Sequence, residues 1–97
     1  MPAFVFVNFD VLDAERQAAL QPRFQAALQR AGARIIAFGN VVDRLEGEIE
    51  PYQRAAVFEF PSLEAARAFY KSDDYAPLRA ERAEIQRARM FIVAPPG

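Results

Sequence analysis

The sequence contains no cysteine, histidine, threonine or tryptophan, and serine occurs only at positions 62 and 72. Without cysteine there is no disulfide, no thiolate nucleophile and no sulfur ligand for a metal. Without histidine the chain lacks the usual general base near neutral pH and the usual zinc or haem ligand. Ser–His–Asp and Cys–His arrangements are therefore excluded. Any catalysis has to use carboxylates, tyrosine, arginine, the single lysine or a bound cofactor.

Length and charge exclude further classes of protein. The chain has 97 residues, 53% of them hydrophobic, and a net charge of −1, which predicts a single domain over residues 1–97. Such a chain is neither disordered nor a basic nucleic-acid-binding protein. No apolar run approaches the roughly 20 residues of a membrane-spanning helix. The first residues lack a basic segment and a small-residue cleavage site, so we expect no export signal and a cytoplasmic location.

The stretch from Arg54 to Tyr75 shows the clearest local structure. Apolar residues at 56–58 and 60 predict a buried strand, with Glu59 as its only charge. Pro61 cannot donate to a sheet, so we expect the strand to end there. Ser62 is a favoured N-cap, and the helix that it opens should run to about Lys71.

Strands and helices alternate along the rest of the chain. Three more strands are predicted at Ala3–Phe9, Arg34–Phe38 and Arg89–Val93. Two more helices are predicted, one from about Ala14 to Ala31 with Asp13 as N-cap, and one to about Arg87 capped by Asp73 or Asp74. Pro22 should kink or restart the first helix, and Gly32 should end it. We expect a bend or bulge at Gly39–Asn40, an extended continuation over Val41–Leu45, and an exposed loop over Glu46–Gln53.

This order, β-α-β-β-α-β with the second helical unit broken in two, is typical of an α+β ferredoxin-like sandwich with an antiparallel four-stranded sheet. Helices can cover only one face of such a sheet. Three of the strands are nevertheless apolar at successive positions, in F-V-F-V, A-A-V-F-E-F and M-F-I-V. We therefore predict a homodimer in which two sheets pack face to face. The alternative is a monomer with a partly exposed apolar face, although large exposed apolar patches are rare.

The segment E-F-P-S-L-E-A-A-R-A-F-Y-K-S-D-D-Y, followed by Arg82, resembles the bacterial domain-of-unknown-function family thirteen-thirty. That family belongs to the dimeric α/β-barrel superfamily of ferredoxin-like folds, and the resemblance extends over nearly the whole chain. It implies the same fold and dimer, with no assigned biochemical role. Among superfamily relatives, the haem-degrading monooxygenases and chlorite dismutases depend on a histidine that is absent here. Analogies with cofactor-free monooxygenases and muconolactone isomerases are compatible with the residues present, although fold does not imply function.

Arg82 is the leading candidate site residue. It lies at helical spacing with Tyr75, Leu78 and Ile85, so we expect it to point inward among apolar neighbours. A desolvated guanidinium needs an anionic or bidentate partner. In the functional interpretation the partner is a ligand carboxylate or enolate oxygen. In the structural interpretation it is an internal ion pair, for instance with Glu59 or Asp10, or the side chain reaches solvent.

Five other residues complete the candidate set. Glu59 can act as a proton acceptor if its face is enclosed, or serve as a structural partner for an arginine. Asn8 and Asp10 end the first strand and can orient a polar ligand or support a turn. Tyr70 and Tyr75 can line a pocket mouth or simply pack. The acidic loop at Glu46, Glu48 and Glu50 is weak evidence for a cation site, and no metal site is predicted.

The functional hypothesis is a homodimer that binds a small polar or anionic organic molecule between sheet and helices, without a cofactor. Catalytic roles are predicted for Glu59 and Arg82, and ligand contacts for Asn8, Asp10, Tyr70, Tyr75 and Arg82. If the protein is an enzyme, proton abstraction next to a carbonyl suits these groups, with arginine stabilising the oxyanion. The alternative is a non-catalytic binding or accessory module.

Overall fold

The computed structural model describes residues 1–96 and contains the predicted order of elements. Its strands are β1 (Ala3–Val11), β2 (Arg34–Asn40), β3 (Arg54–Phe60) and β4 (Gln86–Val93). Its helices are α1 (Ala14–Arg30), α2 (Leu63–Lys71) and α3 (Ala76–Ile85), so the second helical unit is indeed divided. The strands form one sheet in the order β2-β3-β1-β4, and all neighbours are antiparallel. The ferredoxin-like prediction is confirmed.

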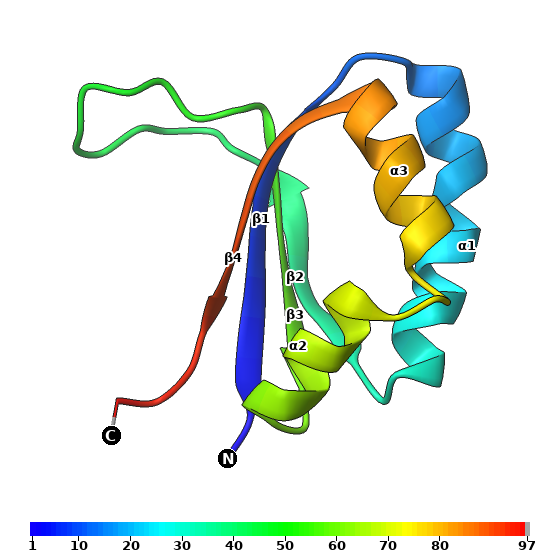
Figure 1. Cartoon of the computed structure of the whole chain (residues 1–97). Helices are drawn as coiled ribbons and strands as arrows, with labels where there is room; N and C mark the ends of the chain where they lie inside the picture. Colours follow the sequence, from blue (N-terminus) through cyan, green and yellow to red (C-terminus); the bar gives the residue numbers. More distant parts are fainter. Residues whose placement is uncertain (97) are drawn as a thin grey trace.

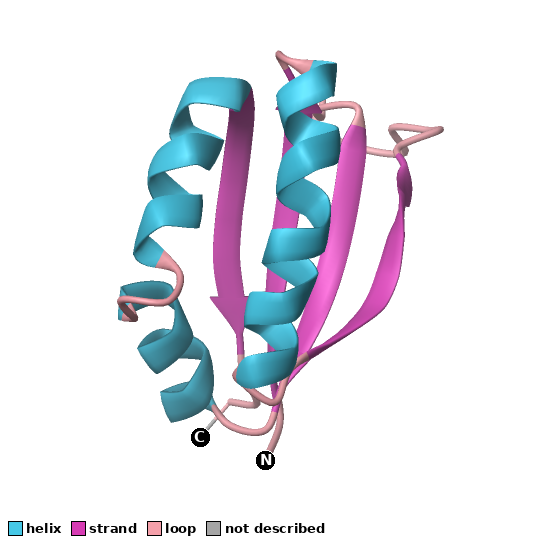
Figure 2. Ribbon diagram, turned by 90° about the vertical axis from the view of Figure 1, so that its right-hand side faces the viewer, coloured by secondary structure: helices cyan, strands magenta, loops and turns pink. Residues whose placement is uncertain are grey.

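All three helices lie on the same face of the sheet (Figures 1 and 2). Burial alternates strictly along β1 and β3: alternate residues from Ala3 to Phe9 and from Ala56 to Phe60 are buried beneath the helices. The residues between them, which include Phe4, Phe6 and Val57, face the other way and are only half-buried. Both faces of these strands are therefore apolar, as the sequence predicts, and the helices cover one of them.

The uncovered side of the sheet is continuous across β1 and β4. Phe4 lies opposite Val93 and Phe6 lies opposite Phe91, and side chains directly opposite each other project from the same face. The rings of Phe6 and Phe91 stack with their centroids 5.5 Å apart. We refer to the face that carries Phe4, Phe6, Val57, Phe91 and Val93 as the open face.

Helix α1 begins and ends as its sequence predicts. The Asp13 side chain accepts a hydrogen bond of 3.1 Å from the Arg16 amide. At the other end Gly32 has a φ of +76°, and the amides of Gly32 and Ala33 donate to the carbonyls of Gln29 and Leu28. Pro22 lies inside the helix, which remains one element.

Two predicted features of the β2 region are wrong. The irregularity in β2 lies between Ile35 and Ala37, not at Gly39–Asn40. The extended continuation over Val41–Leu45 is not formed as a strand, because β3 begins at Arg54, which already pairs with Asn40. Beyond Asn40 there is no strand left to pair with.

The predicted cap of α3 is also wrong. The N-cap position is Tyr75, and neither Asp73 nor Asp74 caps the helix. The Ser72 hydroxyl accepts a hydrogen bond from the Tyr75 amide instead, and Asp74 accepts two hydrogen bonds of 2.8 Å from Arg30. A bidentate guanidinium partner competes well with a backbone amide for a carboxylate.

Residues 41–53 form a long loop, which we name the arm. It leaves the sheet on the side opposite the helices (Figure 1). Three of its apolar residues are strongly exposed, namely Val42, Leu45 and Ile49. Loops of this length without secondary structure are usually either functional or disordered. The base of this one is held by defined hydrogen bonds, described below.

Candidate functional site

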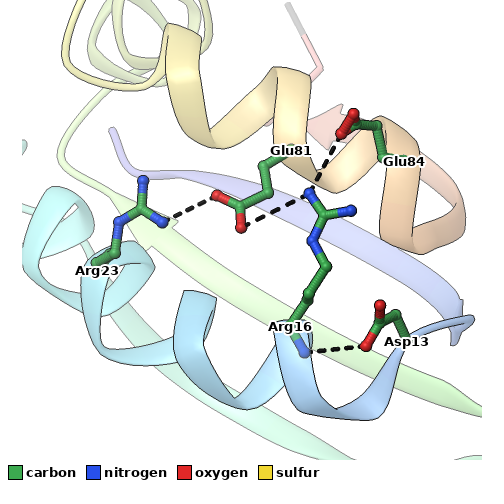
Figure 3. Close-up of polar contacts among 5 residues, drawn as sticks. All are labelled: Asp13, Arg16, Arg23, Glu81 and Glu84. Carbon is green, nitrogen blue, oxygen red and sulfur yellow. Dashed lines mark hydrogen bonds and ion pairs between the residues drawn. The ribbon is translucent and has the colours of Figure 1, made fainter.

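Helices α1 and α3 are joined by ion pairs on their outer surface (Figure 3). Arg23 contacts the Glu81 carboxylate at 2.9 Å, and Arg16 contacts Glu84 at 3.2 Å and Glu81 at 3.9 Å. The acidic residues nearest to Arg82 in the sequence are therefore paired outward with α1. The inner side of α3 therefore carries Arg82 but neither of these carboxylates.

Arg82 points inward, as its helical spacing predicts. Tyr75, Leu78 and Ile85 are buried with it, and only 9% of the Arg82 surface is exposed. Its Nε donates to the Gln86 side-chain oxygen at 3.0 Å, and its Nη1 donates to the Tyr75 hydroxyl. The guanidinium also lies over the ring of Phe24, with the Cζ atom 5.8 Å from the ring centroid.

Nη1 also donates to the Met90 sulfur at 3.8 Å, so all three hydrogen-bond partners of this cation are neutral. Among residues 1–96 no carboxylate forms an ion pair with Arg82. Glu59 instead accepts a 2.6 Å hydrogen bond from Arg34, and the Asp10 carboxylate accepts from the Gln53 amide at 2.7 Å. A desolvated charge that has only neutral partners is an unusual and costly feature of a small protein.

A chain of glutamines extends from Arg82 across to α1. Gln86 accepts from Arg82 and donates to the Gln17 oxygen at 2.6 Å, and Gln17 is within 3.5 Å of Gln21. In this series of glutamines, each side-chain NH2 group donates away from the guanidinium, so the amide oxygens face the positive charge. The chain lowers the cost of burying the cation, but it supplies no countercharge.

Burial raises the pKa of the Tyr75 hydroxyl, and the nearby Arg82 charge opposes that shift only in part. The hydroxyl is therefore neutral at ordinary pH, which agrees with its role as acceptor for the Arg82 guanidinium. It remains available as a donor, because no hydrogen bond within residues 1–96 uses its proton.

A cavity of about 50 Å³ adjoins the guanidinium. It lies between the sheet and α1, and its walls include Val7, Phe58 and Phe38 together with Arg82, Gln17 and Gln86. Among residues 1–96, every side-chain nitrogen or oxygen that is fully enclosed has a hydrogen-bond partner. Nη2 of Arg82 has no such partner, so this nitrogen is not fully enclosed and is accessible. We name this cavity the Arg82 cavity. It has room for a small anionic group, which would accept a hydrogen bond from Nη2.

A second and larger cavity of about 420 Å³ lies between α2 and the sheet. Phe24, Phe58 and Met90 line both cavities. Tyr70 lines the larger one, is 44% exposed, and has the Arg79 guanidinium over its ring. Among residues 1–96, no acidic side chain lines either cavity.

The structure brings together only part of the predicted set. Arg82 and Tyr75 are in contact, and the ring of Tyr70 lies 5.7 Å from that of Tyr75. Asn8, Asp10 and Glu59 lie on the open face, across the sheet from Arg82.

Asn8 and Asp10 hold the base of the arm. The Asn8 side chain donates to the carbonyls of Tyr52 and Arg54 and accepts from the Tyr52 amide, at 2.9 to 3.0 Å. Asp10 accepts from the Gln53 amide. All of these bonds join β1 to the last residues of the arm or the first residue of β3.

Sequence reasoning missed Gln17 and Gln86. Both are buried and both contact the network around Arg82. Gln17 lies three residues before Leu20 and seven before Phe24, on the apolar stripe of α1. A polar residue on such a stripe was the available signal.

The fold and the cavities define a ferredoxin-like α+β protein with a buried arginine beneath its helices. The chain belongs to the family described as Domain of unknown function (DUF1330), whose model matches residues 2–95. The resemblance of residues 59–75 is thereby confirmed. None of the curated proteins matches the chain.

Solved structures share the fold. RPA0582 of Rhodopseudomonas palustris, a protein of unknown function, has a TM-score of 0.76 at 16% identity, covering 99% of this chain and 83% of its own. SnoaB of Streptomyces nogalater, a cofactor-independent oxygenase, has a TM-score of 0.71 at 9% identity, covering 99% and 94%. A dimeric ferredoxin-like protein of unknown function from Jannaschia sp. CCS1 has a TM-score of 0.71 at 10% identity, covering 98% and 100%.

Two further properties concern residues 1–96 as a whole. They include no helix that is both long and apolar enough to cross a membrane. They also include no group of three or more acidic, histidine or cysteine side chains that could hold a metal ion.

Proposed function

We propose that the protein is a homodimer that binds a small organic anion in the Arg82 cavity of each subunit. The observation that carries the proposal is the buried guanidinium with only neutral partners and one accessible nitrogen, Nη2. A carboxylate or enolate oxygen at Nη2 would supply the missing countercharge through a charge-assisted hydrogen bond. The ligand set comprises Arg82, Gln17 and Gln86, with Tyr75 holding the guanidinium in place and Tyr70 at the neighbouring cavity.

The dimer is supported by the open face. Phe91 is 54% exposed and Val93 is 43% exposed, next to the half-buried Phe4, Phe6 and Val57. Monomeric proteins rarely leave such a continuous apolar patch in water. The arm leaves the sheet on the same side and carries further exposed apolar residues (Figure 1). The structural relative from Jannaschia, which is dimeric, shows that the fold is compatible with self-association.

Asn8, Asp10 and Glu59 are left out of the ligand set because they lie on the open face. Without an acidic residue at either cavity, the chain offers no carboxylate base beside Arg82. The site is therefore best suited to a ligand that is already ionised or that loses its proton easily, and the arginine stabilises its negative oxygen.

A second candidate function is cofactor-free catalysis on such an anion, as an isomerase or a monooxygenase. The fold shared with SnoaB, a cofactor-independent oxygenase, favours it over other reactions. It uses the same residues as simple binding, so measured turnover separates an enzyme from a non-catalytic binding module.

A thermal-shift screen of small carboxylates and enolisable ketones tests the proposal. Ligands that bind the folded state raise Tm, and the stabilisation grows with the logarithm of 1 + [L]/Kd. The wild type should be stabilised by at least one anion, and Arg82→Gln should lose that response. Arg79→Gln, which removes a more exposed cation of the same helix, is the matched control and should keep it. An identical response in Arg82→Gln and wild type would remove Arg82 from the site.

A further inference from the structure

The larger cavity differs in chemistry from the Arg82 cavity. Its volume of about 420 Å³ lies within the range of roughly 300–1,000 Å³ that is usual for small-molecule sites. Its walls are apolar and rich in aromatic rings, among them Val5, Phe58, Phe60, Phe69, Tyr70 and Ile92. Phe60 and Phe69 lie against each other with centroids 5.3 Å apart. Such walls suit a flat apolar body, because aromatic rings add edge and face contacts to simple burial.

Two positive side chains also line this cavity. Arg67 and Lys71 are four residues apart on α2, so they project from the same side of the helix about one turn apart. Neither forms an ion pair or a side-chain hydrogen bond within residues 1–96, whereas five other arginines are paired with carboxylates. Two like charges at this spacing repel each other, and an anion between them would relieve that repulsion.

From these observations we infer that the larger cavity is a second binding site, whose ligand is an aromatic carboxylate. The ring system lies among Phe69, Tyr70 and Ile92, and the carboxylate lies at the rim between Arg67 and Lys71. This site does not depend on the proposed role of Arg82, since Arg82 does not line the larger cavity.

The combination of walls and charges selects this class of ligand. An inorganic anion would gain nothing from the apolar walls, and a neutral arene would gain nothing from the two cations. Burial of apolar area contributes about 25 cal/mol per Å², which favours a bicyclic ring over a single one in a cavity of this size.

The test compares 2-naphthoate with the neutral 2-naphthalenemethanol. The chain has no tryptophan, so naphthalene fluorescence can be followed with little background from the protein. The wild type should bind naphthoate at least about tenfold more tightly than the alcohol, which is the effect of one favourable charge contact of about 1.4 kcal/mol. The double variant Arg67→Gln/Lys71→Gln should lose this preference but still bind the alcohol.

A matched control removes two positive charges elsewhere. Arg23→Gln/Arg30→Gln changes two exposed arginines of α1, whose surface ion pairs contribute little to stability. It should keep the preference for naphthoate. The inference is overturned if naphthoate and the alcohol bind equally to wild type, if neither binds, or if both double variants behave alike. It is also overturned if Arg82→Gln abolishes naphthoate binding and Arg67→Gln/Lys71→Gln does not, a result that would leave the proposed role of Arg82 intact.

Discussion

Substitution of Phe6 by serine should weaken the dimer without unfolding the subunit. Phe6 lies near the middle of β1 on the open face, stacked on Phe91 and flanked by Val57 on β3. Its ring does not contribute to the core beneath the helices, which is formed by the alternate residues of the same strand. Serine at this position removes apolar surface from the proposed interface and leaves that core unchanged.

The magnitude follows from how much of Phe6 is already covered. Full burial of a phenylalanine contributes about 1.5–3 kcal/mol, and about half of that remains to be gained when a half-buried ring enters an interface. A twofold-symmetric dimer contains the residue twice, so the loss is again about 1.5–3 kcal/mol. The dissociation constant should therefore rise by about 10- to 150-fold.

Sedimentation equilibrium over a range of concentrations measures this change. The wild type should approach twice the chain mass of 10.9 kDa, and Phe6→Ser should shift towards the monomer at concentrations where wild type remains dimeric. Leu12→Ser is the control, since Leu12 is a 51% exposed apolar residue that follows the end of β1. A wild type that sediments at 10.9 kDa throughout, or a Phe6→Ser variant with unchanged association, would refute the reasoning.

Three other contacts have measurable consequences. Hydrogen bonds from Arg30 lower the pKa of the Asp74 carboxyl below its ordinary 3.8. The stabilisation from these bonds is therefore fully present above pH 3.8, and it is lost as the pH falls through the lower pKa of the folded state. Asp74→Asn should therefore flatten the acid side of a plot of Tm against pH. Burial raises the pKa of Tyr75 above its ordinary 10.0, so stability is lost as pH rises above 10.0, and Tyr75→Phe should lose less of it. Asn8→Ala removes three hydrogen bonds at the base of the arm, and trypsin should then cleave after Arg44 at least about tenfold faster.

Each of these outcomes has a control. Asp73→Asn removes a neighbouring carboxylate that has no ion pair within residues 1–96, and it should leave the acid side of the curve unchanged. If Asp74→Asn also matches wild type there, the ion pair does not stabilise the fold. Tyr52→Phe removes a different tyrosine hydroxyl, and it should leave the alkaline side of the curve unchanged. Unchanged cleavage after Arg44 in Asn8→Ala would mean that the arm is held by other contacts.

Local signals in the sequence predicted most of the fold. Asp13, Ser62 and Gly32 each act at one end of a helix through bonds to backbone groups only a few residues away. Pro61 ends β3 because it has no amide to donate. Such features need no knowledge of distant segments, and for that reason they could be read directly from the sequence.

The errors arose where a distant partner decides the outcome. The sequence predicts Asp73 or Asp74 as the cap of α3, but Arg30, 44 residues away from Asp74 in the sequence, binds Asp74 more effectively. The arm could not be recognised from residues 41–45, which were interpreted as an extended continuation of the second strand. Its course is set by Asn8 and Asp10, which belong to another strand.

Placing the site required knowledge of which face the helices cover. Asn8 and Glu59 were grouped with Arg82 because all three are polar residues in apolar surroundings. The structure places the two strand residues on the open face and the arginine beneath the helices. Their polarity was itself informative, since Asn8, Asp10 and Glu59 all fall on the face that the helices leave open, whereas Arg54, opposite the buried Phe9, is the exception at the start of β3. The inward direction of Arg82, in contrast, followed from helical periodicity alone.

A crystal structure determined in concentrated sodium formate tests the central claim most directly. Formate is small enough for the Arg82 cavity, and it carries the same charged group as the proposed ligands. The account predicts a formate oxygen within about 3 Å of Nη2 of Arg82, at the distance of a charge-assisted hydrogen bond. A cavity that holds only water under these conditions, with formate bound at exposed arginines, would contradict it.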